Sequence, residues 1–135
     1  MTVLNTIIIP RPKVFFEKVK THAGDVDFEV QPELLSLFSN RDFGRYAGEK
    51  GEMNVCFISN NDITGGNSGS AMFNARGELL GLAFDGNWEA MSSDILYEPK
   101  MQRCIGVDVR YILFMIEKYG KAGDLIRELK IVSGK

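Results

Sequence analysis

Apolar and polar positions alternate most clearly in the middle of the chain, where they predict short strands separated by turns. Residues 46–53 are rich in glycine and charge and indicate a loop, which leads into an apolar run at 55–58 that is typical of a buried strand. Residues 71–73 and 78–84 are two further extended apolar runs, joined by a polar turn that ends in Gly77. Because glycine tolerates the left-handed conformation that such a turn needs, this pattern predicts a β-hairpin.

The last third of the chain predicts a strand followed by helices. An apolar run at 103–107 indicates the strand, and Asp108 follows at the position of a helix N-cap. Gly120 ends the helix that we expect there, and a shorter helix is predicted around 124–129. One apolar stripe of the first helix, at spacings of three and four, consists of Ile112, Met115, Ile116 and Tyr119.

The N-terminal part carries weaker signals. Residues 14–19 show modest helical periodicity, and Pro32 opens a helix-like segment, since the fixed φ of proline suits a first helical turn. We therefore divide the chain into a weakly patterned segment, residues 1–30, and one domain, residues 31–135. The expected fold class is mainly β with helices, ending in α-helix.

Composition excludes several classes of function. The 135 residues are 44% hydrophobic, which is enough for one compact domain with a core. The 16 basic and 18 acidic residues create no broad positive field, so neither nucleic acid nor an anionic membrane is an expected partner. The apolar run Ile7–Ile9 is closed by Pro10 and is too short for a signal-peptide core or a membrane span. We expect no targeting signal in this chain.

The sulfur-containing residues suggest no cofactor. Cys56 and Cys104 are too few for a disulfide scaffold and too far apart for a zinc knuckle. Two interpretations stay open: two small buried apolar side chains, which we favour, or a bridge that would imply an oxidising compartment. The methionines follow strand and helix spacing, which indicates core filling, and we expect neither a metal nor a cofactor.

The candidate chemistry lies at residues 60–70, a stretch of turn-forming residues with three glycines. Ser68 stands directly before the hairpin, so its hydroxyl can be presented bare, and the amides of Gly66 and Ser68 can converge as an oxyanion hole requires. Taken alone, the same composition is also typical of an ordinary surface turn. A phosphate loop and a Gly-x-Ser-x-Gly hydrolase elbow both lead into a helix, so neither fits a loop that precedes a strand.

The loop and the strands after it resemble the Gly-Asp-Ser-Gly region of chymotrypsin-fold peptidases, where a serine loop precedes a strand, a glycine turn and a return strand. A more specific resemblance, over about Leu34 to Val132, is to the C-terminal region of the bacterial dipeptidyl-peptidases 7 and 11. It rests on three motifs, Asn60–Ser70, Gly81–Met91 and Val107–Leu113. This resemblance implies the C-terminal part of a chymotrypsin-like double β-barrel, from a periplasmic or secreted serine peptidase that releases dipeptides from peptide N-termini.

The resemblance also implies roles for single residues. Ser68 becomes the nucleophile, with the Gly66 and Ser68 amides as the oxyanion hole, and Asp85 becomes part of the clamp for the substrate's α-ammonium group. Gly86 stands where arginine marks members that prefer acidic P1 residues and glycine marks those that prefer apolar ones. An apolar P1 residue is therefore expected, since glycine leaves an open, uncharged pocket. The expected substrate wall also contains Phe84 and Asn87, while Trp88 either lines the cleft or only packs.

A serine nucleophile needs a base, and the sequence offers a poor candidate. His22, the only histidine, lies in the weakly patterned segment without the family's histidine motif, and we expect an exposed surface histidine. Asp62 and Asp94 have no imidazole to orient and are expected to be loop or capping residues. In the family that the chain resembles, the histidine and aspartate of the triad lie in N-terminal regions. The isolated chain is therefore expected to be a fragment with almost no activity of its own.

Two other functions stay open. One is a non-catalytic binding or assembly module derived from a peptidase half-barrel, whose open sheet edges predict homo-oligomers or domain swapping. The other is a relative of glutamyl endopeptidases, which would need a substrate-contacting histidine after the return strand, where Phe84-Asp85-Gly86 stands. For the peptidase itself, the expected partners are a peptide substrate and the N-terminal part of the enzyme.

Overall fold

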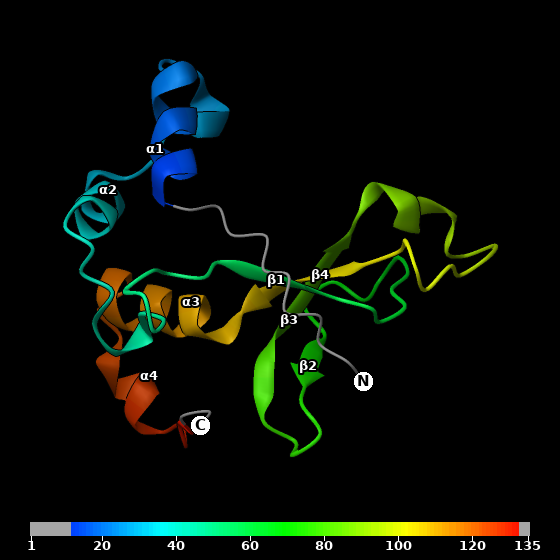
Figure 1. Cartoon of the computed structure of the whole chain (residues 1–135). Helices are drawn as coiled ribbons and strands as arrows, with labels where there is room; N and C mark the ends of the chain where they lie inside the picture. The colour runs from blue at the N-terminus through cyan, green and yellow to red at the C-terminus, as the bar shows by residue number, and fades with distance from the viewer. Residues whose placement is uncertain (1–11, 133–135) are drawn as a thin grey trace. The chain divides into compact units, whose positions relative to one another are not determined.

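The computed structural model describes residues 12–132, which fall into two compact units (Figure 1). A strand unit comprises residues 55–112, and a helical unit comprises residues 12–54 together with 113–132. The apolar run at 7–9 lies outside the described residues. The predicted boundary near residue 31 concerns folding domains and stays a prediction.

The strand unit is built on one antiparallel sheet with the strand order β1-β4-β3-β2 (Figure 1). Its strands are β1 (Cys56–Ser59), β2 (Ala71–Phe73), β3 (Leu79–Gly86) and β4 (Cys104–Asp108). The predicted strands and the predicted hairpin are confirmed. At the end of β4, the Asp108 carboxylate accepts a hydrogen bond from the Arg110 amide at 2.9 Å, the N-cap interaction that begins α3 (Val109–Phe114).

Two glycines make room for Phe57 in the core of the strand unit. A Cβ at Gly106 would lie 2.7 Å from Phe57 Cζ, and a Cβ at Gly81 would lie 2.8 Å from Phe57 Cε1. The same Cβ at Gly81 would lie 1.9 Å from the carbonyl oxygen of Val107 on β4. No side chain fits at such distances, so glycine is required where these strands and the ring meet. Phe57 forms a buried cluster with Met72, Ala83 and Cys104.

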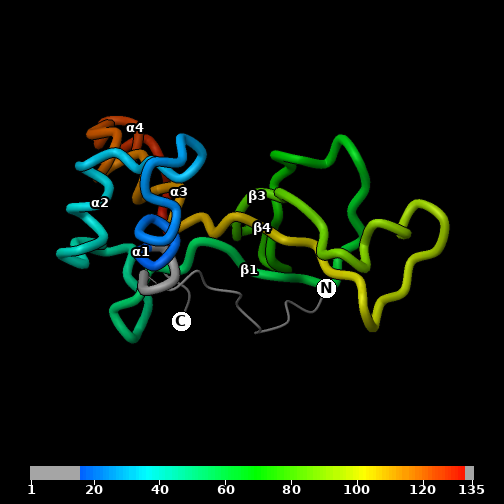
Figure 2. The backbone as a smooth tube through the Cα atoms, turned by 90° about the horizontal axis from the view of Figure 1, so that it is seen from above, coloured from blue at the N-terminus to red at the C-terminus, as the bar shows by residue number. Residues whose placement is uncertain are grey.

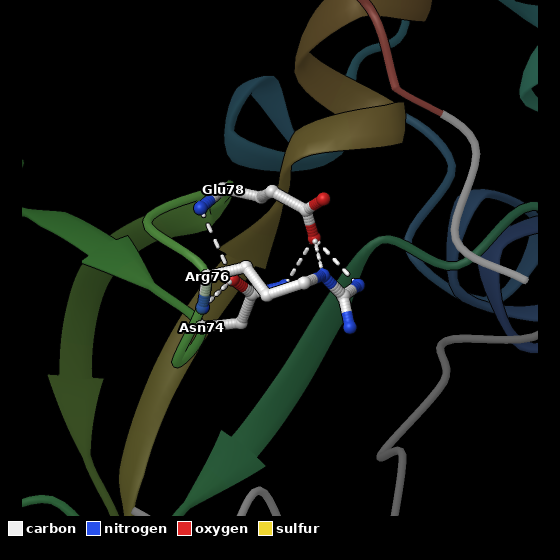
Figure 3. A network of polar contacts seen from close by, with 3 residues as sticks. All are labelled: Asn74, Arg76 and Glu78. Carbon is white, nitrogen blue, oxygen red and sulfur yellow. Dashed lines mark hydrogen bonds and ion pairs between the residues drawn. The ribbon is translucent and has the colours of Figure 1, made fainter.

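A polar network closes the turn between β2 and β3 (Figure 3). Asn74 Oδ1 accepts hydrogen bonds from the backbone amides of Arg76 and Glu78 at 2.8 and 3.0 Å. Glu78 Oε2 accepts from the Arg76 guanidinium at 2.7 and 3.0 Å and from the Asn74 side-chain amide. The hydrogen bond from Arg76 lowers the pKa of Glu78. Because all three residues lie within five positions of one another, the turn is determined locally.

A long excursion, residues 87–103, joins β3 to β4, and we call it the strap. Figure 2 shows it as a yellow-green to yellow loop that leaves the sheet after β3 and returns into β4. It begins with the 3₁₀-helix η3 (Trp88–Ser92). Its ends are held together because Asn87 N donates to Arg103 O at 3.0 Å, while Arg103 N donates to Asn87 Oδ1 at 2.8 Å.

The two cysteines are free thiols. In the pairing of β1 with β4, Cys56 lies opposite Val107 and Cys104 lies opposite Ser59. Residues opposite each other share a face of the sheet and successive residues alternate, so the two cysteines point to opposite faces. A bridge between them is impossible without rearranging the strands, so the alternative of a bridge is wrong. Of the two buried side chains that we favoured, Cys104 is buried and Cys56 is half-buried.

The helical unit consists of short helices around an aromatic core. Phe38, Phe43 and Phe114 pack edge to face with ring centroids 5.4 to 5.9 Å apart. Phe114 is fully buried, although it was absent from the predicted stripe. The reason is that α3 continues as a π-helical turn, η4 (Met115–Tyr119), which breaks the regular 3.6-residue spacing. The remaining helices are α1 (Pro12–Thr21), η1 (Val26–Phe28), α2 (Pro32–Ser39), η2 (Gly44–Tyr46) and α4 (Gly123–Arg127).

A small antiparallel sheet with helices is therefore the observed fold class. The helix predicted from Pro32 corresponds to α2, and the helical periodicity at 14–19 falls within α1. The α-helices contain more residues than the strands, so the expectation of a mainly β chain describes the strand unit and not the whole chain. None of the described helices is long and apolar enough to cross a membrane.

Candidate functional site

Residues 64–70 form two consecutive β-turns that share Asn67. The Asn67 amide donates to the Thr64 carbonyl at 3.2 Å, and the Ser70 amide donates to the Asn67 carbonyl at 3.0 Å. The third residue of each turn is a glycine with positive φ, +92° at Gly66 and +86° at Gly69. Other residues are strained in this conformation, so the glycines are what permits two tight turns in succession. Ser68 lies at the second position of the second turn.

The amides that would form an oxyanion hole are available. Within the described part of the chain, neither the Gly66 amide nor the Ser68 amide donates a hydrogen bond. By contrast, the next amide, that of Gly69, donates to the Ala83 carbonyl on β3 at 2.7 Å, and Ala83 N donates back to Ser70 O at 2.8 Å. The loop is thus anchored on β3 immediately after Ser68, while two donors before that anchor stay free. Free amide donors are what stabilisation of a developing oxyanion needs.

The hydroxyl of Ser68 is exposed and donates a long hydrogen bond to the Phe84 carbonyl at 3.3 Å. Phe84 is the extra residue of a bulge in β3, since Ala83 pairs with Gly106 and Asp85 with Ile105. Bulges interrupt the ladder and often redirect groups beside active sites. Here the bulge turns one carbonyl of β3 toward the serine.

No imidazole occurs in the strand unit, because His22 belongs to the helical unit. Its side chain is exposed, its Nδ1 lies 3.0 Å from both the Lys18 carbonyl and Thr21 Oγ1, and its ring stacks on Phe28 at 4.0 Å. These contacts are all local to α1 and η1. The expected exposed surface histidine is confirmed.

The serine loop, the end of β3 and the strap line a solvent-open cavity of about 230 Å³. The predicted nucleophile and the predicted substrate wall line the same space. Gly66 lies in the first turn and is not among the lining residues. The cavity is lined by Ile63, Thr64, Gly65, Ser68, Phe84, Asp85, Gly86, Asn87, Ala90, Met91, Ser93 and Asp94.

Asp85 and Gly86 give this cavity one charged and one open position. The exposed Asp85 carboxylate accepts a hydrogen bond from the Gly86 amide at 2.8 Å. A Cβ at Gly86 would lie 2.8 Å from the Ala90 Cβ and 3.6 Å from Ile63 Cγ2. The absence of a side chain at Gly86 therefore lets η3 approach β3 closely. An anionic group beside an apolar wall suits a cationic group attached to an apolar one.

Asn87 of the expected substrate wall lines the cavity, and Trp88, for which cleft lining and packing both stayed open, does not. The Asn87 side chain is engaged within the strap, since Nδ2 donates to Met101 O at 2.9 Å and Oδ1 accepts from Arg103. Trp88 is 82% exposed and does not line the cavity. The structure thus supports neither cleft lining nor burial for this ring.

Sequence reasoning did not assign the cavity residues that come from the strap and from the start of the serine loop. Ile63, Thr64, Gly65, Ala90 and Met91 lie inside the motifs Asn60–Ser70 and Gly81–Met91 but received no role of their own. Ser93 and Asp94 lie outside these motifs, in the polar run Ser92-Ser93-Asp94. Asp94 was expected to be a loop residue, and it accepts a hydrogen bond from the Thr64 hydroxyl. The described residues contain no group of histidine, cysteine, aspartate or glutamate side chains that could hold a metal ion.

Comparison with known proteins gives a consistent family. The model of the peptidase S46 family matches residues 13–131. Dipeptidyl-peptidase 7 of Porphyromonas endodontalis is 61% identical over 108 residues, which are 80% of this chain and 13% of that protein. The Asp/Glu-specific dipeptidyl-peptidase of Capnocytophaga gingivalis is 50% identical over 109 residues, 81% of this chain and 15% of that protein. The chain thus spans less than a fifth of the length of these relatives.

A solved structure agrees with the sequence relatives. The crystal structure of Porphyromonas endodontalis DPP11 in complex with the dipeptide Arg-Glu superimposes with a TM-score of 0.80 at 43% identity. The match covers 86% of this chain and 16% of that one. Identity is higher to dipeptidyl-peptidase 7 of P. endodontalis, at 61%, than to the Asp/Glu-specific enzyme of the same organism, at 47%. The chain belongs to the peptidase S46 family of dipeptidyl-peptidases, and within it lies closer to dipeptidyl-peptidase 7.

Proposed function

We propose that this chain supplies the nucleophile and the S1 pocket of a serine-type dipeptidyl-peptidase that releases dipeptides from peptide N-termini. The observation that carries the proposal is the double turn, which presents the Ser68 hydroxyl beside two free amides and in one cavity with Asp85 and Gly86. In this reaction Ser68 Oγ attacks the scissile carbonyl carbon and its proton passes to a base. The amides of Gly66 and Ser68 hold the oxyanion, and the amine leaves with that proton before water releases the dipeptide.

The sheet fits the nucleophile-bearing half of a chymotrypsin-like double β-barrel. The order of the parts is serine loop, β2, glycine turn and β3, and β3 then lines the cavity. The residues at the end of β3 would pair with the backbone of an extended peptide, since the bulge takes Phe84 out of the pairing with β4. This placement in a C-terminal barrel is part of the proposal.

The same cavity supports recognition of a free N-terminus and an apolar P1 side chain. The Asp85 carboxylate would pair with the α-ammonium group, which sets the register at two residues before the scissile bond. Gly86 adds no side chain of its own to a wall that contains the apolar side chains of Ile63, Ala90 and Met91. Without a cation at Gly86, the pocket has no bidentate partner for an acidic P1 side chain.

We further propose that the imidazole acting on Ser68 comes from outside these residues, in the N-terminal part of a full-length periplasmic or secreted enzyme. The contacts of His22 with Lys18, Thr21 and Phe28 are all local and leave it without a catalytic constellation of its own. On this basis the 135 residues alone turn over substrate very slowly, by the oxyanion hole and binding only.

Exposed apolar side chains on the strap support an additional role in assembly. Large apolar side chains that stay exposed in this way mark contact surfaces, and a homo-oligomer is the simplest assembly that would cover them. Light scattering across a concentration series tests this role, because a monomer at every concentration contradicts it. The exposed residues are Trp88, Met91, Ile95, Leu96 and Met101.

A chimera tests the catalytic proposal directly. The 108 residues of this chain that align with dipeptidyl-peptidase 7 of P. endodontalis replace their counterpart in that enzyme. We expect the chimera to release dipeptides from chromogenic substrates with leucine at P1 far faster than with aspartate, and Ser68→Ala to abolish the release. The unmodified relative is the control. A folded chimera that cleaves nothing, or cleaves equally well with Ser68→Ala, would refute the proposal.

A further inference from the structure

Side chains of the strap contact the serine loop in addition to its anchor on β3. Ser93 Oγ donates to the Ile63 carbonyl at 3.1 Å, and the Tyr97 hydroxyl donates to the Asn60 carbonyl. One residue after Ile63 and Ser93 in their segments, the Thr64 hydroxyl donates to the Asp94 carboxylate. The loop is thus tied to the strap at three points that precede the first turn or begin it.

Thr64 is the point from which the first turn is built. Its amide donates to Asn67 Oδ1 at 2.9 Å, and its carbonyl accepts from the Asn67 amide at 3.2 Å. These two bonds enclose Gly65 and Gly66, and Ser68 follows directly. Whatever fixes Thr64 therefore fixes the Gly66 amide and the start of the Ser68 turn.

Packing does not fix this turn. A Cβ placed on Gly65, Gly66 or Gly69 would meet no atom within 4 Å. Glycines without neighbours lose the most conformational entropy on ordering, so hydrogen bonds to less flexible parts must hold the turn in one conformation. Of the three ties to the strap, only the tie of Thr64 involves a carboxylate, which makes a stronger hydrogen bond than a neutral acceptor.

The strap is stiff enough to act as that support. Gln102 is only 3% exposed and satisfies its side chain inside the strap. Its Nε2 donates to Ser92 Oγ at 3.2 Å and to Leu96 O at 3.0 Å, and its Oε1 accepts from Glu98 N at 3.0 Å. Asp94 lies between the two partners of Nε2, in a segment that is cross-linked on both sides.

We propose that Asp94 is a positioning residue for the nucleophile, acting through Thr64 to hold the first turn of the serine loop in the conformation that aligns the Gly66 and Ser68 amides. The inference rests on the proposed function of Ser68. Asp94 donates no proton and touches no reacting atom in this role. It keeps an unpacked glycine turn ordered before substrate binds, so its loss weakens stabilisation of the transition state more than binding of the ground state.

Steady-state kinetics of the chimera test the role. For Asp94→Ala and Thr64→Val we expect kcat to fall by about 5- to 20-fold with little change in KM, the size of one lost charge-assisted hydrogen bond. Asp94→Asn and Thr64→Ser keep an acceptor and a donor and should restore most of the rate. The double variant should be no slower than either single one. A rise in KM at constant kcat, or no rescue by the conservative variants, overturns the proposal.

Amide hydrogen exchange in the 135-residue chain gives a second readout that needs no turnover. Asp94→Ala should speed exchange at Asn67 and Ser70 and shift the amide resonances of Gly66 and Ser68, while the hairpin amides stay unchanged. The matched control is Asp62→Ala, which also removes one carboxylate, here from the serine loop itself, at a side chain without a hydrogen bond among the described residues. Unchanged loop amides in Asp94→Ala refute the inference even if the chimera is active. Perturbed loop amides with an inactive chimera refute only the proposed function.

Discussion

The close approach of Gly86 to Ala90 can be tested by adding one methyl group. In Gly86→Ala the new Cβ would lie 2.8 Å from the Ala90 Cβ, and its next neighbours would be Ile63 Cγ2 at 3.6 Å and the Arg103 carbonyl at 3.8 Å. Only the first distance is too short. The other two are ordinary contacts that need no adjustment, so the whole steric effect is assigned to one pair of methyl groups.

The magnitude follows from that distance. Two carbon atoms prefer a separation of about 3.5 to 4.0 Å, so η3 must move away from β3 by roughly 0.7 Å or more. Overpacking by one methyl group costs about 1 to 3 kcal/mol, and we expect the lower end, because η3 is a single short helix at the edge of a cavity. The displacement also moves Met91, which should change how well the pocket fits an apolar P1 side chain.

A double-mutant cycle separates this clash from other effects. Urea unfolding of the 135-residue chain is measured for the original sequence, Gly86→Ala, Ala90→Gly and the double variant. Ala90→Gly alone should cost about 0.5 to 1 kcal/mol through backbone entropy, but in its presence Gly86→Ala should become nearly neutral. The stability control is Gly65→Ala, where a Cβ meets nothing within 4 Å. If the effects of the two substitutions simply add, the two methyl groups do not meet and the reasoning is wrong.

Three further predictions concern the strand unit. Gly81→Ala should cost more than about 3 kcal/mol or prevent folding, seen as lost circular dichroism or insoluble protein, because its Cβ would lie 1.9 Å from a β4 carbonyl. The lowered pKa of Glu78 stabilises the folded chain above the unfolded pKa of about 4.3, and this stabilisation is lost as pH falls through the lower folded pKa. In Arg76→Ala, the free energy of unfolding should therefore depend less on pH below about 4.3. Burial raises the pKa of Cys56 and Cys104, so both thiols should react slowly with a disulfide reagent at pH 8 until urea unfolds the chain; rapid reaction of the folded protein contradicts this.

Most of the correct predictions about the fold came from interactions between residues that are close together in the sequence. The hairpin follows from short-range chemistry, in which Asn74, Arg76 and Glu78 close the turn and Gly77 adopts φ +75°. The helix after β4 follows from the Asp108 N-cap in the same way. Phe114 was not predicted to be buried, because the stripe was drawn with the 3.6-residue period of an α-helix. A π-helical turn follows Phe114, and no local sequence pattern indicated it.

Some residues of the candidate site could also be predicted from the sequence, and others could not. Residues 84–86 form the end of β3, so their place at the cavity follows once the hairpin is known. The cavity residues of the strap arrive from a segment without periodicity, and their place depends on Asn87 pairing with Arg103 and on Gln102 being buried. The pairing of Asn87 with Arg103 joins positions that are 16 residues apart, and the contacts of Gln102 follow no regular period, so neither leaves a spacing signature.

The glycine-rich loop itself shows why its motif was ambiguous. An ordinary surface turn and a nucleophile loop need the same residues, since both require glycines at positive φ and a small polar residue between them. What separates them is whether the turn is held in one conformation, and here the glycines have no packing neighbours to hold it. The distinction therefore depends on three anchors: Asn67 within the loop, Ala83 on β3, and Asp94, which contacts Thr64 from 30 residues further along the chain. If Asp94→Ala leaves the loop amides unperturbed, the anchors at Ala83 and Asn67 suffice, and the motif with its hairpin already contains everything that positions Ser68.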